Sequence, residues 1–251
     1  MPTPSSPAAP FQMFCLPHAG GNAVGYHQWK RRFAPWVRVC PVELPGHGTR
    51  VREPFATDLD VLLDDITASV VERVDGPYVI FGHSLGGLLA FELARALEAL
   101  DTVPEGPGRC WSAAATRRRC RTAATARPSA ERDPAGGLRA LDGVPADLLA
   151  APHVLELFLP PLRADLTLAE QYHRRPGGPL SCPVHVFAGD RDPVVDDAGL
   201  RAWSAETTRS CQVSRVPGGH MVLREPELMG EVEAALARVT EGGNLTAPRH
   251  P

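Results

Sequence analysis

One serine of the sequence stands in a setting that favours nucleophilic chemistry. Ser84 is the central residue of Gly-His-Ser-Leu-Gly at positions 82–86, a G-x-S-x-G pattern. Glycines two residues to either side let neighbouring backbone segments approach closely, so the serine hydroxyl stands exposed on a sharp turn from a strand to a helix. An apolar run at 78–82 and a helix-forming stretch at 85–100 provide that context. We therefore predict that Ser84 is a nucleophile rather than a serine that only caps a helix.

A serine nucleophile needs a histidine as general base, and around such a turn the partners follow in the order serine, acid, histidine. His220 follows an expected strand and the Gly-Gly turn 218–219, where a loop can carry an imidazole over Ser84. We predict that His220 is the base. The competing histidines lie beside the nucleophile, within expected helices or strands, or in the tail: His83, His153, His173, His185 and His250.

Two carboxylates compete to orient that base. Asp190 and Asp192 share one loop at the end of the expected strand 183–188. Asp192 precedes Pro193, and its position fits a carboxylate that reaches the histidine Nδ1. Asp190 is better explained as a turn residue that accepts local backbone hydrogen bonds. We therefore predict Asp192 as the acid.

The negative oxygen that develops during attack on a carbonyl needs hydrogen-bond donors aimed at it. One donor is the backbone N–H of the residue after the nucleophile, Leu85. The second is expected from the loop that follows an earlier strand, and His-Ala-Gly-Gly at 18–21 is the candidate, through the N–H of Ala19. His18 itself is interpreted as a structural hydrogen-bonding residue, not as a catalytic one.

Short apolar runs alternate with helical patterns between residues 11 and 238. This alternation predicts one α/β domain with a mainly parallel sheet that helices cover on both faces. The expected strands are 11–16, 37–44, 78–82, 183–188 and 212–216, and the expected helices are 58–74, 85–100, 144–172 and 225–239. The segments 1–10 and 239–251 are expected to be disordered tails.

Composition excludes several classes of function for the 251-residue chain. A net charge of −3 gives no electrostatic reason to expect nucleic acid or an anionic membrane as a partner. No run of 18 apolar residues is present, and the first ten residues have neither a basic region nor an apolar core, so neither a membrane span nor a signal peptide is predicted. The six cysteines form no C-x2-C pair that would suggest zinc. We expect a cytoplasmic protein.

Several motifs together resemble the type II thioesterases of polyketide and nonribosomal peptide assembly lines. They are FCLPHAGG at 14–21, ELPGHGTR at 43–50, FGHSLGG at 81–87, LPPLRAD at 159–165 and PGGH at 217–220. The resemblance covers residues 11 to about 100 and about 138 to 238. One departure is His47, which stands where the family often has arginine.

The resemblance implies an α/β-hydrolase fold and a monomeric enzyme that hydrolyses acyl thioesters on the phosphopantetheine arm of carrier proteins. Such enzymes act as editors of stalled synthases and use neither a cofactor nor a metal. By analogy the apolar helical stretch at about 140–175 is a lid over the acyl channel; the alternative is a plain pair of packing helices. Two other functions stay open: a carboxylesterase or lipase acting on free esters, and a carrier-binding protein whose catalysis is impaired.

Residues 109–132 differ from the rest of the chain. They contain seven arginines and seven alanines against a single acidic residue, Glu131, and include no Val, Ile, Leu, Met or Phe. In the family an apolar sheet strand stands here, and residues 108–113 are a weak substitute for it. We interpret the segment as a local out-of-frame translation; a basic docking loop for an acidic carrier protein and a nucleic-acid-binding arm are the alternatives.

This interpretation has a structural consequence. If no strand lies between the nucleophile strand and the acid strand, the sheet loses hydrogen bonds, at about 1 to 3 kcal/mol for each buried unpaired group. The expected result is a chain that folds poorly or is weakly active.

Overall fold

The computed structural model describes residues 11–33, 35–100, 109–113 and 152–242. Within them, one sheet of six parallel strands has the order β2-β1-β3-β4-β5-β6. The strands are β1 (Phe11–Leu16), β2 (Val37–Pro41), β3 (Tyr78–His83), β4 (Arg109–Ala113), β5 (Val184–Gly189) and β6 (Cys211–Val216). The predicted parallel sheet is therefore confirmed.

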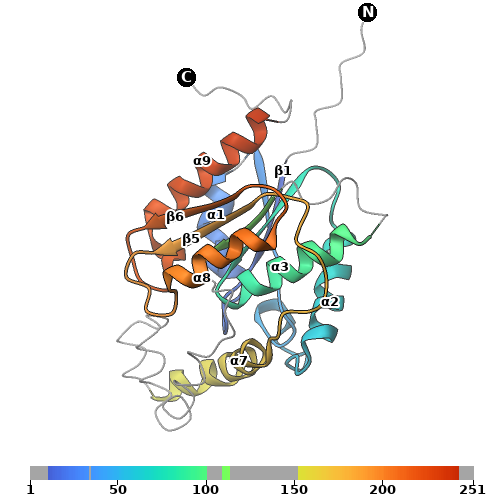
Figure 1. Cartoon of the computed structure of the whole chain (residues 1–251). Coiled ribbons are helices and arrows are strands. Elements are labelled where there is room, and N and C mark those ends of the chain that lie inside the picture. Colours follow the sequence, from blue (N-terminus) through green and yellow to red (C-terminus); the bar gives the residue numbers. More distant parts are fainter. Residues whose placement is uncertain (1–10, 34, 101–108, 114–151, 243–251) are drawn as a thin grey trace, which may run out of the picture.

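Helices cover both faces of this sheet (Figure 1). One layer contains α1 (His27–Phe33) and α9 (Pro226–Gly242), and the other contains α2 (Leu59–Val71), α3 (Leu85–Glu98) and α8 (Asp197–Ala202). The long helix α7 (Pro152–Gln171) lies below the sheet in Figure 1, and its C-terminal part packs Leu168 and Ala169 into the core cluster under α2 and α3. Short 3-10 turns complete the described elements: η1 (Ala23–Tyr26), η2 (Gly48–Arg50), η3 (Trp203–Glu206) and η4 (Val222–Arg224).

Strand β1 is apolar almost without interruption because both of its faces are buried. Met13 and Cys15 pack into the core cluster under α1 and α9, whereas Phe14 and Leu16 pack into the cluster under α2 and α3. Buried parallel strands characteristically read as continuous apolar runs rather than as alternating ones. The central strands are thereby fixed from two sides, and their carboxyl ends become a rigid platform for loops.

The expectation that a strand is missing between β3 and β5 is wrong. Arg109–Ala113 forms β4, which pairs in parallel with β3 from Val79 to His83 and with β5 from Val184 to Phe187. A central strand receives hydrogen bonds from two neighbours, so tertiary pairing can override a weak local preference for strand. Because β4 pairs on both sides, the predicted loss of sheet hydrogen bonds does not occur. The reason for expecting poor folding therefore no longer applies. Residues 114–132 lie outside the described residues, and the out-of-frame interpretation stays a prediction.

Other predicted boundaries have mixed outcomes. Helix α9 continues to Gly242, four residues into the tail predicted to begin at 239. The tail 1–10, the rest of the tail from 243 and the first part of the lid range, 140–151, lie outside the described residues. Two short helices, α1 and α8, were not predicted from the sequence. No helix in the described part of the chain has the length and apolar character needed to cross a bilayer.

The pairing of β4 can be tested by hydrogen exchange. Amide groups of residues 109–113 are expected to exchange about as slowly as those of β3 and β5, because hydrogen bonds in a central strand break only on large-scale opening. Mass spectrometry of peptic fragments measures this, with the loop at Gly177 and Gly178 as a fast-exchanging reference. Exchange of residues 109–113 at the rate of that loop would contradict the strand.

Candidate active site

Ser84 lies at a sharp turn between β3 and α3, as the G-x-S-x-G pattern predicts. Its backbone has φ 56° and ψ −117°, and it is the only non-glycine residue with positive φ in the described residues. The turn is tight because its glycines lack side chains: a Cβ on Gly82 would lie 1.8 Å from the carbonyl oxygen of Gly86. Strain of this kind persists where the surrounding structure enforces it, and it is common at functional sites.

The structure brings the three predicted residues Ser84, His220 and Asp192 together. The Nε2 atom of His220 lies 2.9 Å from Ser84 Oγ, and its Nδ1 atom lies 2.9 Å from Asp192 Oδ2. Because a carboxylate only accepts, the Nδ1–H donates to it, which leaves Nε2 of the neutral ring free to accept the serine proton. The Asp192 side chain is fully buried, and its other oxygen accepts the N–H of Val194 at 2.8 Å. These hydrogen bonds fix the tautomer and the orientation of the imidazole.

Two further side chains hold the loop that carries His220. The buried ring of His83 lies with Nε2 2.8 Å from the carbonyl oxygen of His220, so its side chain points away from the serine hydroxyl, as expected. Asp190 accepts the N–H of Gly218 at 3.0 Å. Asp190 is thus a turn-forming residue, but the prediction of a local bond was wrong, because the bond crosses to the turn after β6.

The loop after β1, residues 17–21, lies against the start of α3, and we call it the oxyanion loop. A Cβ on Gly86 would lie 2.3 Å from the carbonyl oxygen of Leu16 and 2.5 Å from that of Pro17, which shows how closely the loop approaches the nucleophile turn. Leu85 is the first residue of α3, so its N–H has no acceptor within the helix. The two predicted donors, Ala19 and Leu85, are therefore on adjoining segments.

Neutral histidines surround the base. Burial, together with the charges of His220 and Arg224, lowers the pKa of His18 to about 4. Burial also holds the pKa of His83 well below its usual value, and the neighbouring His18 and His220 act in the same direction. At neutral pH both rings are uncharged, so they add no positive charge beside His220 and leave it available as a proton acceptor.

The arrangement of strands, serine turn and histidine loop matches a known family. A family model described as a thioesterase domain matches residues 11–236. The chain belongs to the thioesterase domain family. This membership confirms the family resemblance drawn from the sequence motifs, and with it the α/β-hydrolase fold and the assignment as a thioester hydrolase.

Individual relatives of this thioesterase match over most of their length. Linear gramicidin dehydrogenase LgrE of Brevibacillus parabrevis is 32% identical over 89% of this chain and 87% of its own. Thioesterase PikA5 of Streptomyces venezuelae is 33% identical over 88% of this chain and 78% of its own. Among solved structures, the type II thioesterase BorB of the borrelidin biosynthetic cluster has a TM-score of 0.80 and 34% identity, covering 92% of this chain and 95% of its own.

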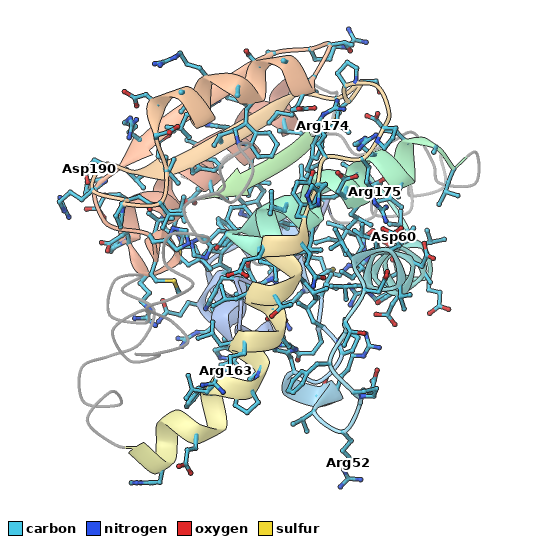
Figure 2. All side chains as sticks on the ribbon, turned by 60° about the horizontal axis from the view of Figure 1, so that its bottom comes forward. Arg52, Asp60, Arg163, Arg174, Arg175 and Asp190 are labelled. Atoms are coloured by element: carbon cyan, nitrogen blue, oxygen red, sulfur yellow. The ribbon has the colours of Figure 1, made fainter. Side chains whose placement is uncertain are left out.

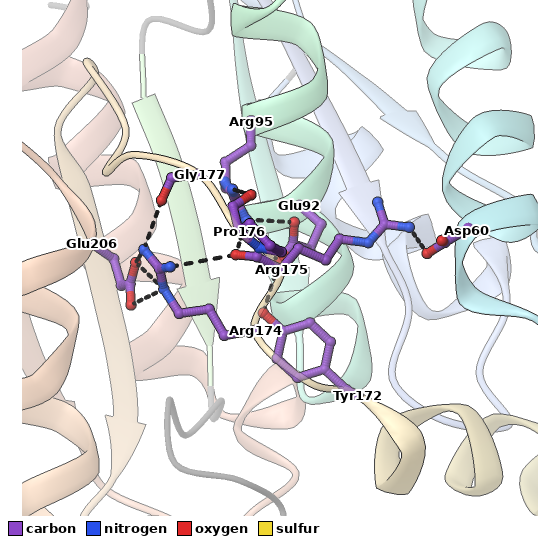
Figure 3. A network of polar contacts seen from close by, with 9 residues as sticks. All are labelled: Asp60, Glu92, Arg95, Tyr172, Arg174, Arg175, Pro176, Gly177 and Glu206. Atoms are coloured by element: carbon purple, nitrogen blue, oxygen red, sulfur yellow. Dashed lines mark hydrogen bonds and ion pairs between the residues drawn. The ribbon is translucent and has the colours of Figure 1, made fainter.

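The thioesterase's long helix α7 is fixed at its C-terminal end to the helix of the nucleophile (Figure 3). Tyr172 donates to Glu92 of α3 at 2.8 Å, and Glu92 is buried and also paired with Arg95 of the same helix. Arg95 in turn donates to the carbonyl oxygen of Pro176 at 2.6 Å. Residues 172–177 therefore form a strap that binds the end of α7 to α3.

The strap also reaches the elements on either side of α3. Arg174 pairs with the buried Glu206 of η3 at 3.0 Å, and Arg175 pairs with Asp60 of α2. Figure 2 shows these arginines on the body of the molecule, whereas Arg163 stands on the exposed side of α7. Pro160 and Pro161 near the middle of α7 interrupt the hydrogen bonds of the helix.

Within the described residues, no group of three or more His, Cys, Asp or Glu side chains is arranged to hold a metal ion. The prediction that the enzyme needs no cofactor is not tested by this arrangement and stays a prediction.

The closeness of the oxyanion loop to the nucleophile turn predicts the effect of a single methyl group. Gly86→Ala is expected to lower kcat for ester and thioester hydrolysis by about 100-fold and the free energy of unfolding by about 1 to 3 kcal/mol, because the new Cβ meets backbone oxygens that cannot move aside. Hydrolysis assays and urea unfolding measure the two effects.

Gly230→Ala is the matched control. This glycine lies within α9 with open space around the position of a Cβ, so the change is expected to leave hydrolysis unaltered and to stabilise the protein by about 0.5 to 1 kcal/mol. Wild-type kcat in Gly86→Ala would show that the close approach is not needed for catalysis.

Proposed function

We propose that this thioesterase hydrolyses acyl groups from the phosphopantetheine arms of carrier proteins, as a stand-alone editing enzyme of polyketide or nonribosomal peptide synthesis. The observation that carries the proposal is the hydrogen-bonded chain from Ser84 through His220 to Asp192 in a member of the thioesterase domain family. PikA5 and BorB, whose names identify thioesterases, support the substrate class.

Acylation begins when Ser84 Oγ attacks the thioester carbonyl carbon and its proton passes to His220 Nε2 at 2.9 Å. The tetrahedral intermediate then collapses, the carbon–sulfur bond breaks, and His220 returns the proton to the leaving thiolate of the phosphopantetheine. Asp192 stabilises the imidazolium that exists between these two proton transfers, because its carboxylate lies 2.9 Å from Nδ1.

Deacylation repeats the sequence with water. His220 takes a proton from a water molecule, the resulting hydroxide attacks the acyl-serine ester, and the proton then returns to Ser84 Oγ as the free acid leaves. In both halves the developing oxyanion is bound by the N–H groups of Ala19 and Leu85. A serine activated in this way needs no metal or organic cofactor, and the acyl group arrives on the partner's own phosphopantetheine.

Other functions are less well supported by the same residues. LgrE carries the name of a dehydrogenase, but the reactive group in this chain is a serine with a base and an acid behind it, which favours hydrolysis over hydride transfer. A carboxylesterase would use the same three residues on free esters. A carrier-binding protein without catalysis is disfavoured by the short, aligned hydrogen bonds. The cytoplasmic location and the monomeric state stay predictions.

Ser84→Ala tests the nucleophile. The change is expected to lower kcat about 10⁴- to 10⁶-fold, because the acyl-enzyme can no longer form. Acyl-carrier thioesters and p-nitrophenyl esters of the same chain length are compared by kcat/KM, and a fluorophosphonate probe monitors labelling of the serine. Unchanged thioester hydrolysis in Ser84→Ala would refute the mechanism, preference for free esters would favour a carboxylesterase, and absence of labelling in folded wild type would favour the non-catalytic binder.

Asp192→Asn tests the acid. An amide at this position cannot stabilise the imidazolium or hold the same tautomer, so kcat is expected to fall about 10⁴-fold with little loss of stability. Asp197→Asn is the control, since Asp197 is exposed and paired with Arg215 on the surface. Equal activity of the two variants would remove Asp192 from the mechanism.

A further inference from the structure

A buried carboxylate on α7 contacts the oxyanion loop at Gly20. Asp165 Oδ2 accepts the N–H of Gly20 at 2.7 Å and lies 3.0 Å from His47 Nε2. The side chains of Asp165 and His47 are 4% and 3% exposed, so both groups are removed from water. One oxygen atom therefore joins three segments: α7, the oxyanion loop and the loop after β2.

The contact to Gly20 fixes the geometry of the oxyanion loop. Gly20 has φ 72°, and the next N–H, of Gly21, donates to the carbonyl oxygen of His18 at 2.8 Å. The peptide group between Ala19 and Gly20 is held by Asp165, and the turn closed by Gly21 holds the residues around it. Because the direction of the Ala19 N–H depends on these neighbouring peptides, a displacement of Asp165 changes where that donor points.

The hydrogen bonds of His47 make this contact depend on its protonation. Nδ1 lies 2.9 Å from the carbonyl oxygen of Pro45, and because a carbonyl only accepts, Nδ1 must carry the proton there. In the neutral ring Nε2 then carries no hydrogen, and it lies 3.0 Å from an oxygen of Asp165 with no charge to attract that oxygen. In the protonated ring the positive charge lies beside the Asp165 carboxylate, and the contact becomes an ion pair.

The charged groups around this pair favour the protonated ring. Burial lowers the pKa of His47, but the hydrogen bond and charge of Asp165, the Pro45 carbonyl and the charge of Glu43 raise it by more, so its pKa lies above the ordinary value. On the side of the oxyanion loop, Asp165 faces His18, whose pKa of about 4 leaves it neutral. The ring of Phe55 covers another side of His47 and carries no charge.

We propose that Asp165 is a positioning residue for the oxyanion loop and that protonated His47 holds its carboxylate in place, so that turnover depends on the charge of His47. This inference rests on the proposed hydrolytic function of Ser84. It assigns to α7, which the sequence predicts to be part of a lid, a task in the chemistry itself, and it makes the charge of His47 a determinant of turnover.

The sign of the pH dependence follows. Below the pKa of His47 the ion pair is present and the oxyanion loop is held, whereas kcat falls as the pH rises through that pKa. The wild type is expected to have an alkaline limb in its profile of kcat, which comes from His47.

The experiment measures kcat and KM from about pH 5 to 10 with an acyl thioester, after subtraction of the Ser84→Ala rate at each pH. His47→Arg keeps a permanent charge, and His47→Gln supplies a non-titrating N–H donor; both are expected to abolish the alkaline limb. Asp165→Asn is expected to lower kcat about 10- to 100-fold with KM changed less than about 3-fold, and to make a further change at His47 nearly silent. His27→Arg, at an exposed histidine, is the control and keeps the wild-type profile.

The outcomes separate this inference from the proposed function. Equal hydrolysis by wild type and Ser84→Ala overturns the function and the inference together. Ser84-dependent hydrolysis with the same alkaline limb in wild type and both His47 variants overturns the inference alone, as does wild-type kcat in Asp165→Asn. If His47→Arg does not fold, as judged by fluorophosphonate labelling and thermal unfolding, His47→Gln and Asp165→Asn still decide the question.

Discussion

The positive φ of Ser84 is the constraint on which the rest of the site depends. A side chain at φ 56° is held only because β3 is hydrogen-bonded on both sides and α3 is buried along most of its length. The same tight turn requires glycine at 82 and 86, and the missing side chain at 86 admits the oxyanion loop. Nucleophile and oxyanion donors are therefore positioned by one packing arrangement, not by two independent ones.

Polar contacts attach α7 to this centre. The strap 172–177 joins the end of α7 to the helix of the nucleophile, and Asp165, two turns earlier, joins α7 to the oxyanion loop. These two attachments lie at the C-terminal half of α7, so the position of this half is tied both to the helix of the nucleophile and to the oxyanion loop. Under the positioning role proposed for Asp165, a displacement of this half of α7 would also redirect the Ala19 N–H.

Much of this could be predicted from the sequence, because the signals are local. The strand before Ser84, the helix after it and the order serine, aspartate, histidine depend on short patterns. What could not be predicted depends on partners distant in the chain. Strand β4 has a weak sequence of its own and is stabilised by its neighbours, and α1 is too short for a periodic pattern. His47 and Asp165 are 118 positions apart, and no spacing rule connects them.

The loop that carries His220 is held by a neighbour of each other member of the triad: His83 next to the nucleophile, and Asp190 two residues before the acid. The turn at 217–220 therefore sets the positions of the three reacting side chains relative to one another. The consequence concerns the number of residues in this turn. An insertion or deletion of one residue in this turn would break both attachments at once, so the number of residues between β6 and His220 is constrained as well as their identity.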